Sequence, residues 1–233
     1  MPLLDHFAPP VDERISWAAF HANWAARLAE HITELLPDGF TAEETFYPSC
    51  EVAIDVATYE DAGRAADPLR SDWQPPEPDH AAELAFPESH EVKVYRATGG
   101  RTLVAAIELV SLSNKDWPAE RLAFATKCAA YLFNGVSLIV VDVVTERPGN
   151  IHNEIVRLMT GQASGQIAGG VRLYAVAYRP VVREKVVELD VWAHPLTVGA
   201  LLPTLPLRLV GDYFLPVNLD ETYQEACRRQ RLV

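Results

Sequence analysis

The chain is 233 residues long and 49% hydrophobic, which is enough to bury a core within a single domain. Its formal net charge of -12 counts against a nucleic-acid partner, because phosphate binding is normally driven by clusters of Lys and Arg. Residues 60 to 90 contain eight acidic and two basic residues and contribute half of that charge. The rest of the chain is acidic as well, so the sequence contains no basic footprint for a polynucleotide.

The cysteines and the hydropathy of the chain exclude further classes of protein. Cys50, Cys128 and Cys227 are far apart and show no CxxC spacing, which argues against a disulfide framework or a zinc cluster. The N-terminus lacks a basic segment followed by an apolar run, and no stretch approaches the roughly 20 apolar residues needed to span a bilayer. The sequence therefore predicts a cytoplasmic protein without a membrane partner.

An amphipathic helix is predicted over residues 15 to 36, where apolar residues recur at intervals of three and four. Glu30 lies nearly opposite this stripe and should meet solvent. Glu34 lies roughly 100° from the centre of the stripe and could therefore flank a site. Pro37-Asp38-Gly39 provides the turn signal that ends the helix.

Strands are predicted next over residues 40 to 47 and 51 to 58, and alternation in the second puts Asp55 between Ala53 and Ala57. These small neighbours leave room for a metal or a substrate, although an Asp on the solvated face of an edge strand gives the same pattern. Residues 60 to 89 mix proline with acidic residues and alanine, which predicts a long acidic, Pro-rich loop.

A lone carboxylate, Glu108, stands inside the otherwise apolar strand predicted over residues 101 to 110. This strand and the one near residues 91 to 97 are separated by Thr98-Gly99-Gly100, a hairpin signal. Alternation puts Glu108 on the same face as Val110. A charged group at such a place usually has a function or an ion partner.

A helix from Pro118 to about Phe133 is predicted to follow, and Asn134-Gly135 is its C-cap signal. It carries Lys127 and Tyr131 one turn apart. The strand predicted over residues 136 to 144 is apolar on both faces, as expected for a buried strand reached by a helical crossover.

The C-terminal part is predicted to begin with a short helix over residues 151 to 159, followed by a glycine-spaced loop over 161 to 170 that lacks the ending of a phosphate-binding P-loop. A strand pair is predicted next, over residues 171 to 179 and 185 to 193, and a closing helix over 219 to 230. The whole order predicts one α/β domain of the α+β kind over residues 1–233, with a mixed β-sheet and flanking helices. Its core spans residues 15–146, and the C-terminal strand pair and helix span 171–230.

Two acids on neighbouring strands, Asp55 and Glu108, could bind one Mg²⁺ if those strands pair in the right register. The ion would lower the pKa of a bound water and stabilise charge on a phosphoryl oxygen, and a Lys beside it could orient or deprotonate the attacking water. A salt bridge from Glu108 to Lys93 or Arg101 would give the same sequence pattern. Asp142, in the buried strand, is expected to support the sheet instead of binding a metal.

Three stretches, Ile107 to Lys115, Lys127-x3-Tyr131-x3-Gly135-Val136 and Leu138 to Asp142, carry a resemblance to known proteins. They resemble the central block of the Uma-type restriction-endonuclease-like proteins, which belong to the PD-(D/E)XK nuclease superfamily. The opening and the Pro-rich ending of the chain resemble a related bacterial family of unknown function. The resemblance follows the element order over most of the chain but is specific only from Ala106 to about Asn150.

The resemblance implies a restriction-endonuclease-like core in which a helix precedes three strands, an Asp and a Glu on adjacent strands bind Mg²⁺, and a Lys completes the site. Carried over to this chain, Asp55 and Glu108 are the metal ligands, and Glu34 is an accessory acid from the first helix. DNA is the partner that this class implies, and a homodimer is left open.

The chain departs from the parent motif two residues after the Glu, where Val110 stands in place of the motif Lys. Lys127 is the expected replacement, because its helical spacing puts it on the same face as Phe124 and Tyr131. Lys115 follows the strand end directly and is the runner-up, and either Lys could instead be a solvated surface charge. The apolar face of the helix is predicted to consist of Leu122, Ala125, Ala129 and Leu132.

Three functions are compatible with these features. The first is an Mg²⁺-dependent phosphodiester hydrolase, endonuclease-like, acting on DNA through Asp55, Glu108 and Lys127. The second is a binding or regulatory module that keeps the fold without cleavage, which the acidic charge and Val110 favour. The third is an enzyme acting on a small phosphorylated substrate, which needs no basic groove.

Overall fold

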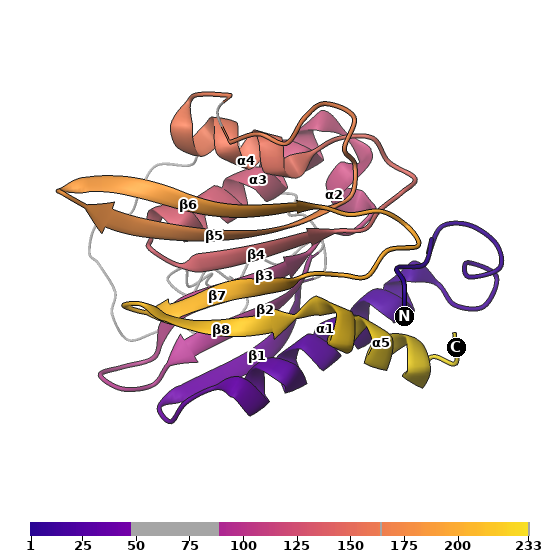
Figure 1. The fold of residues 1–233 in the computed structure, drawn as a ribbon, viewed down its shortest axis with the longest axis horizontal. Helices are drawn as coiled ribbons and strands as arrows, with labels where there is room; N and C mark the ends of the chain where they lie inside the picture. The colour runs from indigo at the N-terminus through magenta and orange to yellow at the C-terminus, as the bar shows by residue number, and fades with distance from the viewer. Residues whose placement is uncertain (48–88, 164, 233) are drawn as a thin grey trace, which may run out of the picture.

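The computed structural model describes residues 1–47, 89–163 and 165–232 of the chain. Its centre is a six-stranded sheet with the spatial order β1-β2-β3-β4-β5-β6 (Figure 1). The strands are β1 (Phe40–Tyr47), β2 (Ser89–Arg96), β3 (Thr102–Leu109), β4 (Ser137–Asp142), β5 (Tyr174–Arg183) and β6 (Val186–Pro195). The described strands of this sheet therefore follow one another in space in the order in which they occur along the chain.

The sheet is mixed, because one of its five strand pairs is parallel. β3 and β4 run parallel, whereas the other neighbours pair antiparallel. A parallel pair needs a crossover, and here the crossover contains two helices, α2 (Ser113–Asp116) and α3 (Pro118–Phe133). The prediction of an α+β fold with a mixed sheet and flanking helices is confirmed.

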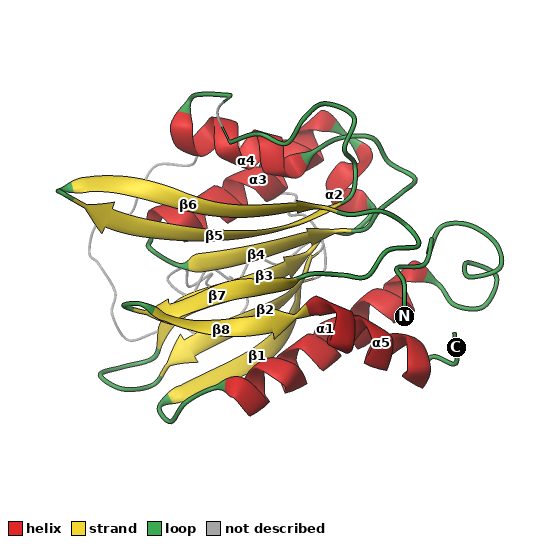
Figure 2. Cartoon of the chain, in the orientation of Figure 1, coloured by secondary structure: helices red, strands yellow, loops and turns green. Residues whose placement is uncertain are grey.

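Both faces of the sheet are covered (Figure 2). On one face, residues such as Ile107 and Ile139 pack against α1 (Trp17–Leu35), α5 (Leu219–Arg229) and a two-stranded ribbon of β7 (Thr204–Val210) and β8 (Tyr213–Asn218). On the other face, residues such as Ala106 and Val140 pack against α3 and α4 (Ile151–Thr160). Because side chains alternate along a strand, Glu91, Glu108 and Asp142 all belong to the face under α3 and α4.

The first helix forms where its apolar stripe predicts it. Ser16 caps its start, since the Ser16 side chain accepts a hydrogen bond from the backbone N–H of Ala19. Phe20, Trp24 and Leu28 on the stripe are fully buried. The packing of this stripe fixes α1 on the sheet face that does not carry Glu108.

Most predicted elements are confirmed within a few residues, and two elements of the structure were not predicted. The strand predicted over residues 51 to 58 and the loop over 60 to 89 fall almost wholly outside the described residues. The short helix α2 was not predicted. The ribbon β7–β8 was not predicted either, because Pro206 and Pro216 interrupt the usual strand signal.

The predicted C-terminal hairpin is present as β5–β6, but its strands are longer than expected and its turn lies at Glu184 and Lys185, both with positive φ. In the part of the chain that the structure describes, no helix combines the length and the apolar character that a membrane crossing requires.

Candidate functional site: a buried carboxylate–lysine cluster

A pair of buried carboxylates lies in the middle of the sheet, where Glu91 of β2 is the direct cross-strand partner of Glu108 of β3. The two strands form a hairpin whose turn contains Gly99 and Gly100, with φ values of 84° and 106° that favour glycine. Glu91 and Glu108 are 1% and 0% exposed. Like charges directly opposite one another destabilise a sheet, so this pair needs a counter-ion.

The ammonium of Lys127 is that counter-ion. Its Nζ lies 2.7 Å from Oε1 of Glu108 and 3.0 Å from Oε2 of Glu91. α3 crosses this face of the sheet and brings the lysine there, and the Lys127 side chain is 25% exposed. Lys127 therefore reaches the two carboxylates from the surface of the molecule.

Two further groups hold Glu91. Tyr131, one turn after Lys127 on α3, donates a hydrogen bond to Oε2 of Glu91 at 3.0 Å. Lys93, two residues along β2, places its Nζ 3.2 Å from Oε1 of Glu91. The cluster thus contains two Glu and two Lys, and its formal charges balance.

Burial and charge set the protonation of the pair. Burial is the main cause that raises the pKa of Glu108, the neighbouring Glu91 acts in the same direction and Lys127 opposes both, so that this pKa lies above its usual range. Burial also acts to raise the pKa of Glu91, but Lys127, a hydrogen bond with Glu108 and Lys93 together outweigh it and lower this pKa to about 2. Glu91 is therefore the stronger acid of the pair and releases its proton at a lower pH than Glu108 does.

Lys127 keeps its charge in this setting. Burial alone would lower its pKa, but Glu108 and Glu91 together raise it well above its usual range. An ammonium held in this way cannot accept a proton. It can donate hydrogen bonds, so of the two roles considered for a catalytic Lys, only orientation of a water or of a negatively charged oxygen suits Lys127.

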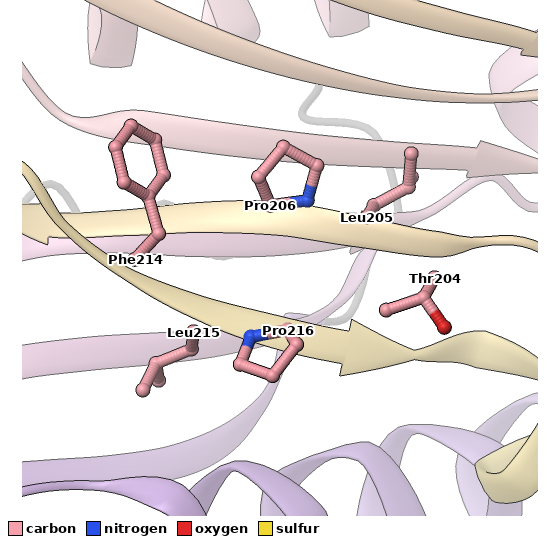
Figure 3. Close-up of a pocket in the computed structure, with 6 residues that line it drawn as sticks. All are labelled: Thr204, Leu205, Pro206, Phe214, Leu215 and Pro216. Atoms are coloured by element: carbon pink, nitrogen blue, oxygen red, sulfur yellow. The ribbon is translucent and has the colours of Figure 1, made fainter.

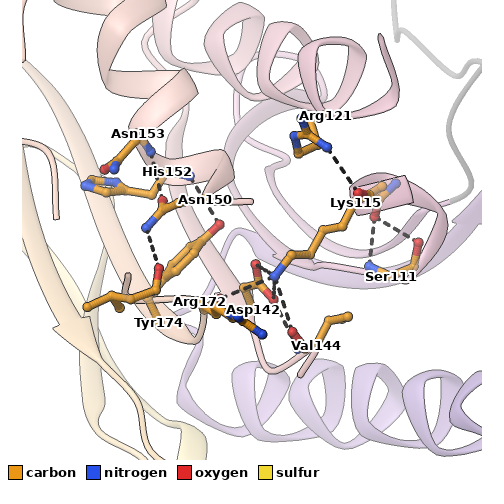
Figure 4. Close-up of polar contacts among 12 residues, drawn as sticks. Ser111, Lys115, Arg121, Asp142, Val144, Asn150, His152, Asn153, Arg172 and Tyr174 are labelled. Carbon is orange, nitrogen blue, oxygen red and sulfur yellow. Dashed lines mark hydrogen bonds and ion pairs between the residues drawn. The ribbon is translucent and has the colours of Figure 1, made fainter. Parts of the chain in front are cut away.

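A second buried ion pair lies on the same face, at the end of β4 (Figure 4). The ammonium of Lys115, on α2, lies 2.9 Å from Oδ2 of Asp142, and both side chains are 0% exposed. It also donates to the backbone carbonyls of Val144 and Arg172, each at 3.3 Å. Burial raises the pKa of Asp142 to about 6, and Lys115 limits the rise. The expectation that Asp142 supports the sheet is confirmed.

A chain of polar contacts continues from this pair towards α4. Tyr174 interacts with the Asp142 carboxylate and accepts a hydrogen bond from the backbone N–H of His152. Nε2 of His152 lies 3.0 Å from the carbonyl oxygen of Gly165, so Nε2 carries the proton. Nδ1 of His152 therefore accepts from Tyr178 at 2.7 Å. Figure 4 shows Lys115 beside Asp142, and Tyr174 in contact with the backbone of His152.

The structure brings together only part of the predicted site. Glu108 and Lys127 are in contact. Lys115 is buried and forms an ion pair with Asp142. It is therefore neither the lysine beside Glu108 nor a solvated surface charge, the two positions considered for it. Glu34 is exposed on α1, which covers the opposite face of the sheet, and it is not brought to Glu108. Asp55 lies outside the described residues.

The orientation of α3 corrects one expectation. Leu122 was placed on the apolar face of this helix, but it is 45% exposed, whereas Phe124 is fully buried. The buried face is therefore turned towards the Phe124 side, and this rotation points Lys127 and Tyr131 at the sheet.

Glu91 is the site residue that sequence reasoning missed, although the signal was present. Counting outwards in equal steps from a two-residue turn at Gly99-Gly100 pairs Glu91 with Glu108, and the structure reaches this pairing through a register shift between Val94 and Tyr95. The strand that follows residue 89, and not one containing Asp55, is the neighbour of β3 on this side, and β4 is its neighbour on the other. Within the described residues, the acid opposite Glu108 is therefore Glu91.

A divalent ion would find two suitable donors here. Glu91 and Glu108 direct hard carboxylate oxygens at one cationic group, and such oxygens are the donors that Mg²⁺ prefers when waters complete its shell. The donor chemistry therefore fits, but the oxygens in question bind the ammonium of Lys127. No group of three or more His, Cys, Asp or Glu side chains that could hold a metal occurs among residues 1–47, 89–163 and 165–232.

A separate cavity of about 280 Å³ lies on the β7–β8 ribbon (Figure 3). Its lining residues are Thr204, Leu205, Pro206, Phe214, Leu215 and Pro216. Pro206 and Pro216 face each other across the ribbon. None of the lining side chains is ionisable, so this cavity lacks the groups that acid–base or metal chemistry requires.

The fold and the site together define an α+β protein whose mixed sheet buries a carboxylate–lysine cluster beneath the β3–β4 crossover. Comparisons of the chain with protein-family models, with curated proteins and with solved structures found no match.

Proposed function

We propose that the protein is an Mg²⁺-dependent phosphodiester hydrolase of the restriction-endonuclease-like class, with Glu108, Glu91 and Lys127 as its site. The observation that supports the proposal is the convergence of two carboxylates from neighbouring strands on one lysine from α3, whose Nζ lies 2.7 Å from Glu108 and 3.0 Å from Glu91. The order α1, β1, β2, β3, α3, β4 agrees with the core that the sequence resemblance implies. Lys127 takes the role that Val110 cannot fill.

Glu91 and Glu108 would hold the ion, and Asp55 remains a proposed third ligand. Bound Mg²⁺ makes a coordinated water more acidic and stabilises negative charge on a phosphoryl oxygen. The chain's own contribution is positional. Tyr131 and Lys93 fix Glu91 through its two oxygens, and Lys127, which stays charged, would donate hydrogen bonds to a phosphoryl oxygen of the substrate once the ion has taken its place on the carboxylates.

A second candidate is a module that keeps this fold and binds or regulates without cleavage. The burial of both carboxylates favours it, since Glu91 and Glu108 are 1% and 0% exposed and Lys127 and Lys93 already neutralise them. The net charge of -12 points the same way.

The two candidates differ in a cleavage assay. Purified protein is incubated with supercoiled plasmid, single-stranded DNA and RNA in Mg²⁺ or Mn²⁺, together with Glu108→Gln and Glu43→Gln. Gln resembles the protonated form of Glu108, so the first variant should keep its fold. Glu43 is the control for the loss of a strand Glu, because its side chain is 49% exposed and forms a surface ion pair with Arg101.

The proposal expects cleavage by the wild type and by Glu43→Gln, and none by Glu108→Gln. Cleavage that survives Glu108→Gln would move the activity to another site or to a contaminant. A folded wild type that cleaves none of the three substrates would favour the non-cleaving module.

A further inference from the structure

We infer that Lys127 is a resident counter-cation of the Glu91–Glu108 pair, and that a divalent ion can occupy this pair only when the lysine side chain withdraws. The inference rests on the proposed function and concerns the regulation of the same site. The position of the Lys127 side chain then decides whether the two carboxylates can bind a metal ion.

Competition for the same oxygens is the first reason. The ammonium of Lys127 binds Oε1 of Glu108 at 2.7 Å and Oε2 of Glu91 at 3.0 Å. A divalent ion shared by these two side chains would need oxygens of the same two carboxylates, which the sheet holds side by side. Two cations on one buried pair would also repel each other strongly.

Charge balance is the second reason. With both lysines in place, the two glutamates of the cluster are neutralised by Lys127 and Lys93. A divalent ion added to this arrangement would bury two uncompensated positive charges, which is costly. If the Lys127 ammonium moves away, the two glutamates and Lys93 carry a net charge of -1. A bound divalent ion then brings the net charge of the cluster to only +1. Exchange is therefore favoured over addition.

The accessibility of the groups shows which of them can move. Glu91 and Glu108 are carried by central strands and are 1% and 0% exposed, so they cannot turn outwards without breaking the sheet. Lys127 has a flexible four-carbon side chain that is 25% exposed. Rotation about the bonds of this side chain can therefore move the ammonium away from the carboxylates.

The test measures metal affinity and not catalysis. Mn²⁺ binding to the full chain is followed by electron paramagnetic resonance and by titration calorimetry, for the wild type and for Lys127→Met. Lys185→Met is the matched control, because it removes an equal charge from an exposed position in the β5–β6 turn. The double variant Lys127→Met with Glu108→Gln removes one of the two carboxylates as well.

The inference expects Lys127→Met to bind one Mn²⁺ at least about tenfold more tightly than the wild type, which is about 1.4 kcal/mol. Lys185→Met should bind like the wild type, and the double variant should lose the gain. Equal affinity of Lys127→Met and the wild type would overturn the inference, and so would a gain that persists in the double variant.

Two further outcomes are decided in advance. If Lys127→Met does not fold without metal, recovery of its far-ultraviolet circular dichroism on addition of Mn²⁺ supports the inference, and no recovery at millimolar Mn²⁺ contradicts it. Failure here is distinct from failure of the proposed function. Wild-type cleavage with no affinity gain rejects the lysine exchange alone, and a gain without cleavage by any form rejects the hydrolase alone.

Discussion

Removal of the Lys115 ammonium should destabilise the protein strongly and in a pH-dependent way. Lys115 and Asp142 are both fully buried, and Lys115→Met leaves the carboxylate without its cation. Breaking one partner of a buried ion pair costs about 3–5 kcal/mol, so we expect a loss of this size in the free energy of unfolding at pH 8. Lys185→Met, at an exposed turn, should change it by less than about 0.5 kcal/mol.

The pH dependence follows from the raised pKa of Asp142. Burial raises this pKa from 3.8 to about 6, so the folded protein binds the proton more tightly than the unfolded chain does. The free energy of unfolding therefore falls by about 3 kcal/mol in total as pH rises from about 4 to about 6, and this contribution does not change further above that range. At pH 5 Asp142 is mostly protonated in the wild type, and loss of Lys115 should therefore matter less there than at pH 8.

A double-mutant cycle isolates the pair. Asp142→Asn keeps an oxygen that can accept from the backbone N–H of Val144, as Oδ1 of Asp142 does. Lys115→Met with Asp142→Asn should cost at least about 2 kcal/mol less than the sum of the single changes. Urea unfolding followed by tryptophan fluorescence at pH 5 and pH 8 provides the four free energies. Additive costs, or a Lys115→Met cost that is equal at the two pH values, would refute the reasoning.

Three further changes have definite expected results, each read from the free energy of unfolding in urea. Trp24→Ala should cost about 3–5 kcal/mol, since the ring is 0% exposed and its loss leaves a cavity between α1 and α5; a cost below 1 kcal/mol would contradict this packing. Tyr131→Phe should cost about 1.5–3 kcal/mol, because the hydroxyl donates to the ionised Glu91, and an unchanged stability would place that hydrogen bond elsewhere. Burial lowers the pKa of His21 to about 3, with a further contribution from His90, so wild-type stability should fall as pH drops through 6.5 towards 3. His21→Phe should reduce the stability difference between pH 7.5 and pH 4.5 by about 2 to 3 kcal/mol, and an unchanged difference would assign the acid sensitivity to other groups.

The sequence predicted most of the fold because the periodic signals were strong. Helix α3 begins after the Pro118 signal and ends at Asn134-Gly135, and the apolar stripe of α1 predicted both its length and its buried face. The β7–β8 ribbon escaped prediction, because proline is normally excluded from strands. It is tolerated at Pro206 and Pro216 because a two-stranded ribbon leaves edge positions without ladder partners.

The site was less predictable than the fold, because it depends on which strands pair. Glu108 and Lys127 stood out as a lone acid in an apolar strand and a lysine on the following helix. Glu91 lies in a strand that also carries Ser89, His90, Lys93 and Arg96, and it gave no such contrast. The sequence around Lys115 is compatible with an exposed lysine, because most lysines are exposed. Only the tertiary fold shows that Lys115 neutralises Asp142.

The crossover between β3 and β4 carries both lysines that neutralise the acids of the two strands it connects, Glu108 by Lys127 and Asp142 by Lys115. Neither strand can be buried before the segment between them is in place, because a bare carboxylate would enter the core. The parallel pair and its crossover should therefore form and open as one cooperative unit, and their amide hydrogens should exchange together. In this protein the chain segment that fixes the strand order also supplies the charge without which that order could not be packed.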